Sequence, residues 1–584
     1  MKNIYFLILF FTIASFSFSQ NLSQARKTNW SFAGINHVVN QPSNQINIMS
    51  FGADATGVNP SNLAMQSAIS SLNGNAGVIN LPAGTFLFTS SIILPDSVIL
   101  RGAGSTSTLL QFNLNGTGDL IRIAGSAQLK NSRLISSSIK DSSFVEITNP
   151  SNFSIGDYFR IYQNDSSIVT SSWAYNSVGQ IMHITSIVGN RVYFNGVLRK
   201  NYLLSDSCKF EKCNMKKSIG IECMKIERLD ASVGQTTNIA FDYAADCWVS
   251  GIESYNCNFG HLVFSKCTNC YVYGNYFHHA FAYGGNGQGY GVVLQYTSGE
   301  CLVENNVFNH LRHSMLLQAG ANGNVCAFNY SLDTYWTSFP SNSAGDIVLH
   351  GNYIFMNLFE ENIVQNIVID ASHGINGPYN TFFRNRAELY GIVMSTNPSS
   401  DNQNYIGNEI TNSSFPYGQY SLTGIGNFEF GNNKQGTCIP SNTSAITDIS
   451  YYYTGTPWFL TSNYSYPTIG YSNSLNANSI PAKDRYSSGN FTLCSNILTE
   501  ATNTKQNKSI ALFPNPANDV LFVQSDYGSA LTFSIYNSEG KLVDSGDLLH
   551  ESKIDLTALT NGIYFITFSK STQAVSSQKF ILNR

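Results

Sequence analysis

The pattern of apolar and polar positions predicts short strands along most of the chain. Strand patterns at 77–86 and 98–104 are bounded by Gly and Pro, as expected for a β protein with many turns. One helical spacing stands out at 60–72, with Asn59 as its expected N-cap and a proline in its first turn. The pattern therefore predicts an all-β protein with one early helix.

An asparagine recurs at a nearly constant period in the middle of the chain. Successive sequence positions differ by 23, 31, 23, 33, 23 and 23, so the basic period is 23 and two coils carry insertions of 8 and 10. Parallel stacking puts equivalent side chains about 4.8 Å apart, and the amides should form a hydrogen-bonded ladder. The column comprises Ile252, Asn275, Asn306, Asn329, Asn362, Asn385 and Asn408.

Two segments depart from this repeat. Residues 142–205 contain hairpin patterns at 155–161 and 184–194, which predict an inserted β-subdomain with antiparallel strands. A Thr-, Asn- and Lys-rich stretch at 496–508 has no apolar periodicity and is expected to be a linker. A separate C-terminal unit should follow it.

Four motifs near the start of the chain occur in an order known from one superfamily. They are Phe51-Gly52-Ala53, Gln66 to Ile69, Leu81 to Phe86, and Leu100 to Gly104. Together they resemble the opening of the pectate-lyase-like superfamily. The resemblance implies a right-handed, single-stranded parallel β-helix, which we expect over residues 20–495.

The end of the chain carries a second resemblance. The motifs are Phe513 to Ala517, Ile535 to Lys541, Leu559 to Phe565, and Lys579 to Ile581. In this order they closely resemble the C-terminal sorting domain of the Bacteroidetes type IX secretion system. The resemblance implies a small β-sandwich over residues 509–584 and the type IX secretion machinery as a partner.

The N-terminus also fits export. Lys2 precedes an apolar run from Ile4 to about Phe16, and small residues follow up to Ser19, which predicts a signal peptide over residues 1–19. This run is shorter than the roughly 20 residues of a membrane span, and no later segment reaches that length without polar interruption. We expect a secreted or outer-surface protein without a membrane span.

Composition narrows the partners. Charged residues make up 12% of the chain and the formal net charge is −4, so no basic tract exists to bind the phosphates of nucleic acid. Nine of the 11 cysteines lie between Cys208 and Cys326, mostly in apolar settings that predict buried thiols. One or two disulfides would suit an exported protein. A lone Cys-x-x-Cys pair, Cys267 and Cys270, does not predict a zinc site.

A polar column lies four positions after the asparagine column and includes His279, His310 and Asp333. The two insertions follow His279 and Asp333, so their loops should emerge on the same side and wall a groove. Flat aromatic rings in such loops suit the C–H faces of sugars, although loop packing is the alternative interpretation. The loop aromatics are Tyr283, Tyr290, Tyr335 and Trp336.

Two more histidines are candidates for the same site. His350 and His373 are separated by one basic period, so we expect them to share a column, and Asp370 is close in sequence. They form either a hydrogen-bonded feature of the core or part of the groove lining.

Two arginines also have two interpretations. Arg384 shares a column with Glu361, and Arg386 shares one with Glu409, so ion pairs between coils account for all four residues. Alternatively, one arginine neutralises a uronate carboxylate, which would let a nearby His or Tyr begin β-elimination.

Hydrolysis has a different requirement. It needs two carboxyl groups roughly 5 to 9.5 Å apart. The candidates are Asp333, Asp346, Glu360 and Asp370. The Asn-Thr-Asp, Asp-Asp and Arg-Ile-Lys motifs of polygalacturonases do not occur, nor does a clear pectate-lyase calcium cluster. We therefore expect that no cofactor is required; calcium is the alternative, without a clear motif to support it. We expect a polysaccharide-degrading enzyme acting by β-elimination or hydrolysis; the alternative is a noncatalytic glycan-binding or adhesive β-helix.

Overall fold

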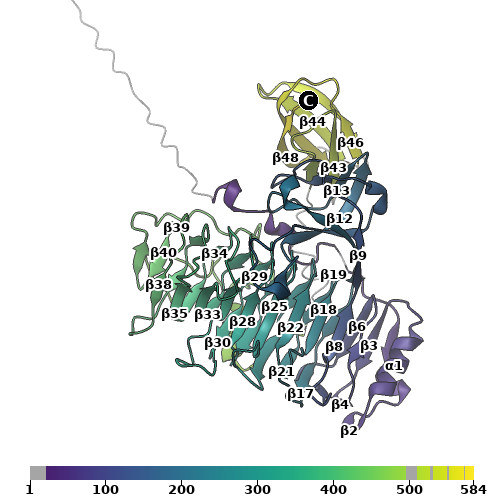
Figure 1. Ribbon diagram of the computed structural model, residues 1–584, viewed down its shortest axis with the longest axis vertical. Coiled ribbons are helices and arrows are strands. Elements are labelled where there is room, and N and C mark those ends of the chain that lie inside the picture. Colours follow the sequence, from purple (N-terminus) through teal and green to yellow (C-terminus); the bar gives the residue numbers. More distant parts are fainter. Residues whose placement is uncertain (1–21, 38, 495–509, 526–530, 549–551, 571–572) are drawn as a thin grey trace, which may run out of the picture.

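Parallel strands stack into a right-handed β-helix that makes up most of the molecule (Figure 1). The computed structural model describes residues 22–37, 39–494, 510–525, 531–548, 552–570 and 573–584. The predicted signal peptide, residues 1–19, and the predicted linker, residues 496–508, lie outside the described residues.

Each coil contributes a strand to three parallel faces. The first face is a 12-stranded sheet. Its strands are β1 (Gln45–Asn47), β3 (Gly77–Leu81), β6 (Val98–Gly102), β16 (Gly220–Glu222), β20 (Trp248–Ser250), β23 (Tyr271–Tyr273), β26 (Leu302–Glu304), β29 (Val325–Ala327), β32 (Leu358–Glu360), β34 (Thr381–Phe383), β36 (Asn404–Ile406) and β39 (Phe428–Phe430).

After each first-face strand, the chain passes through a strand of the second face and then a strand of the third face. Two long strands, β33 (Ile363–Asp370) and β35 (Arg386–Met394), belong to both of these faces. The second face contains β2 (Thr56–Pro60), β4 (Gly84–Phe88), β7 (Thr108–Phe112), β17 (Lys225–Arg228), β21 (Glu253–Cys257), β24 (Tyr276–Ala280), β27 (Val307–Asn309), β30 (Tyr330–Leu332), β37 (Glu409–Ile410) and β40 (Asn432–Lys434). The third face contains β5 (Ile92–Ile93), β8 (Ile121–Ala124), β18 (Ile239–Asp242), β22 (Gly260–Ser265), β25 (Tyr290–Gln295), β28 (His313–Leu317), β31 (Ile347–His350) and β38 (Gln419–Ser421).

The predicted helix covers the N-terminal end of this stack as α1 (Asn62–Ser71). The predicted start was wrong: Ser61 is the N-cap, because Pro60 still pairs with Leu87 of β4 as the last residue of β2. Inside the helix, apolar side chains from all three faces form one continuous core. Burial of one side of every strand is what closes the coils around that core.

The predicted asparagine ladder is confirmed. In each coil the side-chain Oδ1 accepts a hydrogen bond from the Nδ2 of the preceding asparagine, at 2.8 to 3.0 Å from Asn275 to Asn408 and on to Asn432. The same oxygens also accept backbone N–H groups, beginning with Ile252 at 3.0 Å. The ladder therefore satisfies the polar groups of a buried corner.

A second ladder runs parallel to the first in the turn before the first face. Asn324, Asn357, Asn380 and Gln403 are joined by side-chain hydrogen bonds of 2.9 to 3.0 Å. Their sequence separations of 33, 23 and 23 repeat the period of the first ladder. The same signal was thus available in the sequence, five positions before Asn329, Asn362, Asn385 and Asn408.

The insertion is a six-stranded sheet whose strand pairings are all antiparallel, as predicted. It spans residues 126–214 and is wider than the expected 142–205, because β9 and β14, its first and last strands in the sequence, directly continue the flanking coils. It has its own apolar core. The strands are β9 (Ser126–Lys130), β10 (Phe144–Glu146), β11 (Tyr158–Tyr162), β12 (Gly179–Val188), β13 (Arg191–Phe194) and β14 (Lys209–Asn214).

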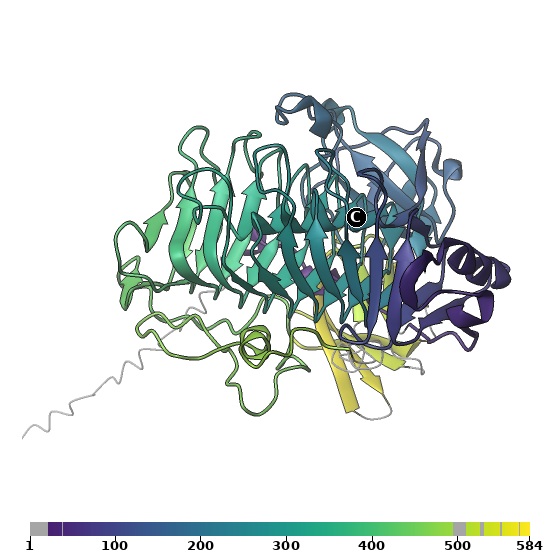
Figure 2. The same ribbon diagram turned by 90° about the horizontal axis from the view of Figure 1, so that it is seen from below.

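Two extended segments cover the outside of the first face, and its strands from β16 to β36 are buried on both sides. Residues 22–36 contribute Trp30, and residues 446–493 contribute Tyr452 and α2 (Pro481–Ser487) to a shared apolar cluster. Figure 2 shows the second segment as light green loops along one side of the stack. A disulfide between Cys223 and Cys494 ties its end to the helix, and the nine free cysteines are buried except for the half-buried Cys438.

The C-terminal unit is a sandwich of two antiparallel sheets around one core that includes Leu521, Ile535 and Phe568. Within the described part of the chain, no helix is long and apolar enough to cross a membrane. One sheet holds β42 (Ile510–Phe513), β43 (Val520–Ser525) and β46 (Ser552–Asp555); the other holds β44 (Leu531–Asn537), β45 (Leu542–Leu548), β47 (Gly562–Lys570) and β48 (Gln573–Leu582).

Candidate functional site

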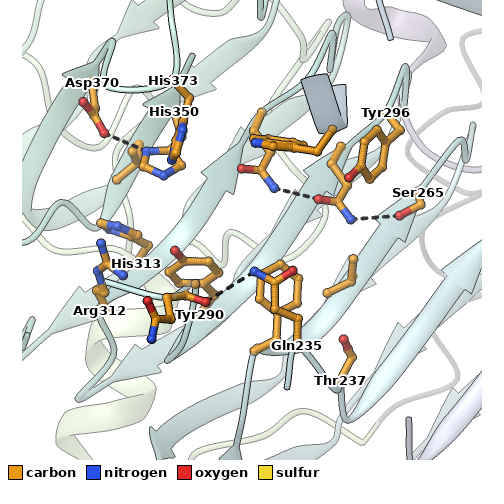
Figure 3. A pocket seen from close by; sticks show the side chains of 18 of the residues that line it. Gln235, Thr237, Ser265, Tyr290, Tyr296, Arg312, His313, His350, Asp370 and His373 are labelled. Atoms are coloured by element: carbon orange, nitrogen blue, oxygen red, sulfur yellow. Dashed lines mark hydrogen bonds and ion pairs between the residues drawn. The ribbon is translucent and has the colours of Figure 1, made fainter. Parts of the chain in front are cut away.

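A groove of about 960 Å³ runs along the outer side of the third face (Figure 3). Its floor is a column of small apolar side chains, among them Val263, Val348 and Val368. The inserted loops 281–289 and 333–346 form one wall, as the sequence predicted. The opposite wall contains Trp173 of the inserted subdomain and the turn after β33.

A polar column borders this apolar floor. Because neighbouring strands are in register, one polar residue from each coil lies beside the next along the groove. Gln318 Nε2 donates to Gln295 Oε1 at 2.7 Å, and Gln295 Nε2 donates to Ser265 Oγ at 3.0 Å. The column consists of Asp242, Ser265, Gln295, Gln318, His350 and Asp370.

The column ends in a histidine–aspartate pair. His350 Nδ1 is 2.7 Å from Asp370 Oδ2, and Asp370 also accepts hydrogen bonds from the backbone N–H and hydroxyl of Ser372. Burial opposes the charge, but the contacts with His350 and Ser372 outweigh it and hold the pKa of Asp370 well below its usual range. The contact lacks hydrogen-bond geometry, and Nδ1 has no hydrogen-bond partner within the described residues.

A second imidazole lies beside this pair. His313 Nδ1 is 2.9 Å from the carbonyl oxygen of Gly345, and its ring centroid is 5.7 Å from that of His350. Burial lowers the pKa of His313 well below its usual value, and the neighbouring His350 and Arg312 act in the same direction. His313 is therefore a neutral acceptor through Nε2. The sequence analysis missed it, although it shares a strand register with the candidate Tyr290.

A buried arginine completes this end of the groove. The guanidinium carbon of Arg312 is 5.8 Å from the ring centroid of Tyr290 and 5.7 Å from that of Trp336. Its Nη1 donates to the carbonyl of Gly284, while its Nε finds no hydrogen-bond partner within the described residues. Arg312, which the sequence analysis also missed, is thus a cation with unused hydrogen-bonding capacity at the groove wall.

Aromatic rings line both walls. Tyr290 and Trp336 lie in the groove as predicted. Trp173 comes from the opposite side, where its ring makes edge contacts with His373 at 5.7 Å and Tyr296 at 6.1 Å. No sequence period could place it there, because the inserted subdomain interrupts the repeat.

Five predicted site residues form a separate corner cluster and do not line the groove. His310 Nδ1 is 2.7 Å from Asp333 Oδ2, and the His310 ring is 5.0 Å from that of His279. The expectation of one shared groove was wrong for them. At His279, His310 and Asp333 φ is positive (52° to 60°), where the chain turns between two faces. The corner cluster consists of His279, Tyr283, His310, Asp333 and Tyr335.

The expected stacking of His350 on His373 was also wrong in register. His350 pairs with Asp370, because the coil between these two strands is shorter at this point than the period of the asparagine corner. His373 lies in the turn that follows, where its ring contacts that of His350 at 4.7 Å. All three residues line the groove.

The two candidate arginines do not approach the groove, in contrast to the carboxylate-binding interpretation. Arg384 donates to the carbonyls of Gly470 and Asp448, and Arg386 donates to that of Asn478. Both are buried beneath the segment 446–493. The ion pair between Arg386 and Glu409 is confirmed, at 2.6 Å.

Two of the carboxylates considered for hydrolysis are likewise buried away from the groove. Asp346 accepts hydrogen bonds from Ser331 and from the backbone of Gln365 and Asn366, and burial raises its pKa to about 6. Glu360 accepts the backbone N–H of Tyr451 beneath the covering segment. No group of three or more His, Cys, Asp or Glu side chains in the described ranges has an arrangement that could hold a metal ion.

Three-faced parallel coils and a C-terminal sandwich define the class: the chain is a parallel β-helix protein with a small C-terminal β-sandwich. Residues 45–190 match the family described as "Rhamnogalacturonase A/epimerase, pectate lyase-like", and residues 511–583 match "Secretion system C-terminal sorting domain". The sorting domain indicates type IX secretion to the cell surface or the extracellular space. The first match ends before most of the groove begins.

The chain is similar to solved structures. The tailspike gp61 of Pseudomonas phage phi297 is 14% identical with a TM-score of 0.50, over 68% of this chain and 66% of that chain. This chain thus covers just under two thirds of that tailspike. The tailspike gp49 of Pseudomonas phage LKA1 is 14% identical with a TM-score of 0.43, over 66% of this chain and 79% of that chain. No curated protein matches the chain.

Proposed function

We propose that this protein is a secreted or surface-attached enzyme that degrades an acidic polysaccharide in the third-face groove. The observation that carries the proposal is the pair of His350 and Asp370, with Arg312 and His313 nearby on the neighbouring coil. An oriented imidazole with a free Nε2 suits a general base, and a guanidinium with unused donors suits a carboxylate. Aromatic rings and a narrow apolar floor suit sugar rings.

The spacing of carboxylates in the groove argues against hydrolysis by a carboxylate pair. From Asp242 the register passes through Ser265, Gln295, Gln318 and His350 to Asp370. Five strand spacings of about 4.8 Å separate the two carboxylates by roughly 24 Å. Glycosidases need roughly 5 to 9.5 Å. Asp119, the remaining acidic residue of the lining, precedes β8, which lies beyond β18 on the side away from Asp370.

β-Elimination fits the groups that do lie together. In this reaction Arg312 binds the uronate carboxylate, and His350 Nε2 removes the proton from the adjacent carbon. The electron pair of the C–H bond forms a carbon–carbon double bond as the bond to the glycosidic oxygen breaks. Tyr290, whose pKa is raised by burial, remains protonated and donates its proton to the leaving oxygen.

Noncatalytic glycan binding is the second candidate. The hydrogen-bonded amides of Gln295 and Gln318 favour it, because such groups can exchange their mutual bonds for sugar hydroxyls. In that case the histidines contribute hydrogen bonds and no chemistry.

One assay separates these functions. The mature protein is incubated with soluble uronate-containing and neutral polysaccharides, each with and without calcium. Elimination produces an unsaturated, ultraviolet-absorbing end; hydrolysis produces reducing ends alone; binding produces neither and is read by affinity electrophoresis. An ultraviolet-absorbing product from a uronate polymer supports the proposal, and reducing ends alone would overturn it.

A further inference from the structure

The most exposed large apolar side chains of the described residues lie along one corner of the β-helix. Phe339 and Phe415 are each 95% exposed and Val233 is 93% exposed, whereas the next, Leu63, is 78% exposed. All three belong to loops that lead from the second face to the third. We call these three side chains the apolar rim.

The loops that carry the two phenylalanines share a motif and touch each other. Ser-Phe-Pro occurs at 338–340 and again at 414–416. The side-chain amide of Asn342 in the first loop donates to the hydroxyl of Tyr417 in the second at 3.1 Å. Within the first loop, Trp336 Nε1 donates to Pro340 O at 2.9 Å. These bonds hold the backbone while the phenyl rings stay in solvent.

The apolar rim adjoins the groove. Trp336 and Ser343 from the loop of Phe339, and Gln235 from the loop of Val233, line the groove itself. The same loops therefore present one set of side chains to the groove and another to solvent. The contact between the loops of Phe339 and Phe415 brings two exposed phenyl rings to one part of this corner. Grouped exposed apolar side chains mark a binding surface more often than single ones do.

The chemistry of these loops favours one kind of partner. The segments 229–238, 333–346 and 411–418 contain no Lys or Arg, so they lack the cations that bring proteins to anionic membranes. Neutral Ser, Thr, Asn and Gly surround the phenyl rings instead. This mixture suits a sugar polymer, whose C–H faces stack on the rings and whose hydroxyls bond to the polar neighbours.

We propose that the apolar rim binds the surface of an insoluble polysaccharide and holds the protein where single chains can enter the groove. This inference rests on the proposed function only in taking the bound polymer to be the groove's substrate. Binding through the rim itself needs neither His350 nor Arg312.

The test is a pelleting assay with the Phe339→Ser/Phe415→Ser double variant. The probes are insoluble plant, algal and fungal cell-wall polysaccharides, with phosphatidylglycerol vesicles as a separate arm. The double variant should bind the polysaccharide that retains the wild type at least about tenfold more weakly, because two apolar contacts are lost. A matched control, Leu63→Ser/Ile425→Ser, removes exposed apolar side chains elsewhere and should pellet like wild type.

The outcomes distinguish the rim from the groove. His350→Ala should pellet normally, and the rim double variant should turn over soluble oligosaccharides normally. If wild type pellets but cleaves nothing, the proposed function fails and the rim proposal stands. Equal pelleting of wild type and the double variant, pelleting with vesicles alone, or no pelleting with any polysaccharide would overturn the rim proposal.

Discussion

His350 on β31 and Asp370 on β33 are in-register neighbours on adjacent coils, with Nδ1 and Oδ2 2.7 Å apart. His350 and Asp370 are thus both held on paired strands, and bringing them together does not require a loop to become ordered. In the proposed reaction, Nδ1 of His350 carries its proton toward Asp370 and Nε2 acts as the base. It also makes the pair testable by single substitutions.

Replacing His350 by Ala should lower kcat on the uronate polymer by about 10²- to 10⁴-fold, because the base is lost. Asp370→Asn should lower it as well, since an amide no longer favours the tautomer with Nδ1 protonated. Steady-state kinetics on purified variants, with melting temperatures recorded alongside, measure both effects.

His310→Ala is the control for this prediction. It removes a histidine that also contacts an aspartate at 2.7 Å, but from the corner cluster outside the groove. Its kcat should match that of wild type. Equal losses in the His310 and His350 variants would contradict the assignment of the groove as the reaction site.

Arg312→Lys should raise KM for uronate oligosaccharides by about 10- to 100-fold, because a charged hydrogen bond contributes about 1.5 to 3 kcal/mol. Lysine keeps the charge but not the planar fork that lies between Tyr290 and Trp336. Arg191→Lys, a surface substitution at the ion pair with Glu146, is the matched control. An unchanged KM in the Arg312 variant would mean that the carboxylate binds elsewhere.

Asn329→Ala should destabilise the β-helix by on the order of 2 to 5 kcal/mol, because each buried donor left unpaired costs about 1 to 3 kcal/mol. The substitution removes the oxygen that accepts from both N and Nδ2 of Asn306. Thermal unfolding should show a lower melting temperature, whereas Asn473→Ala, at an exposed asparagine, should leave it unchanged. Equal melting temperatures for the two variants would refute a stabilising role for the ladder.

Stability should fall as the pH rises through 7 to 8. Burial, only partly offset by hydrogen bonds to the covering segment, raises the pKa of Glu360 to about 7 and that of Glu361 to about 8. Both carboxyls have a pKa of about 4.5 in the unfolded chain, so the folded chain keeps protons that the unfolded chain releases. Their contribution to the free energy of unfolding is therefore full below about pH 4.5 and is lost as the pH rises through these folded pKa values.

The measurement is the melting temperature between pH 4.5 and 9 for wild type and Glu361→Gln. Glutamine is neutral throughout, so the variant should lose less stability over this range than wild type does. Glu227→Gln, at a half-buried residue that accepts a hydrogen bond from Gln111, should keep the wild-type slope. A Glu361 variant with that same slope would contradict the prediction.

The period of the asparagines was sufficient to predict the stack, its ladder and the two inserted loops. Stacked coils need the same residue type at the same corner in every turn. The register between coils therefore corresponds to a regular spacing in the sequence. The sorting domain was likewise readable, because its short motifs occur in order at the end of the chain. The second ladder carried the same period and could have been found the same way.

The members of the groove were decided by the tertiary structure. The number of residues between the asparagine corner and the third face varies from coil to coil. His350 is therefore aligned with Asp370 instead of His373. Positive φ angles at His279 and His310 turned the predicted site residues into a separate cluster.

Contacts between distant segments decided the rest. Arg384 and Arg386 were hidden by the segment 446–493, and Trp173 was brought to the groove by the inserted sheet. The sequence repeat identifies the positions that are equivalent in successive coils. Turn conformations, uneven coil lengths and the docking of non-repeating segments depend on packing between distant parts of the chain, and no local spacing records them.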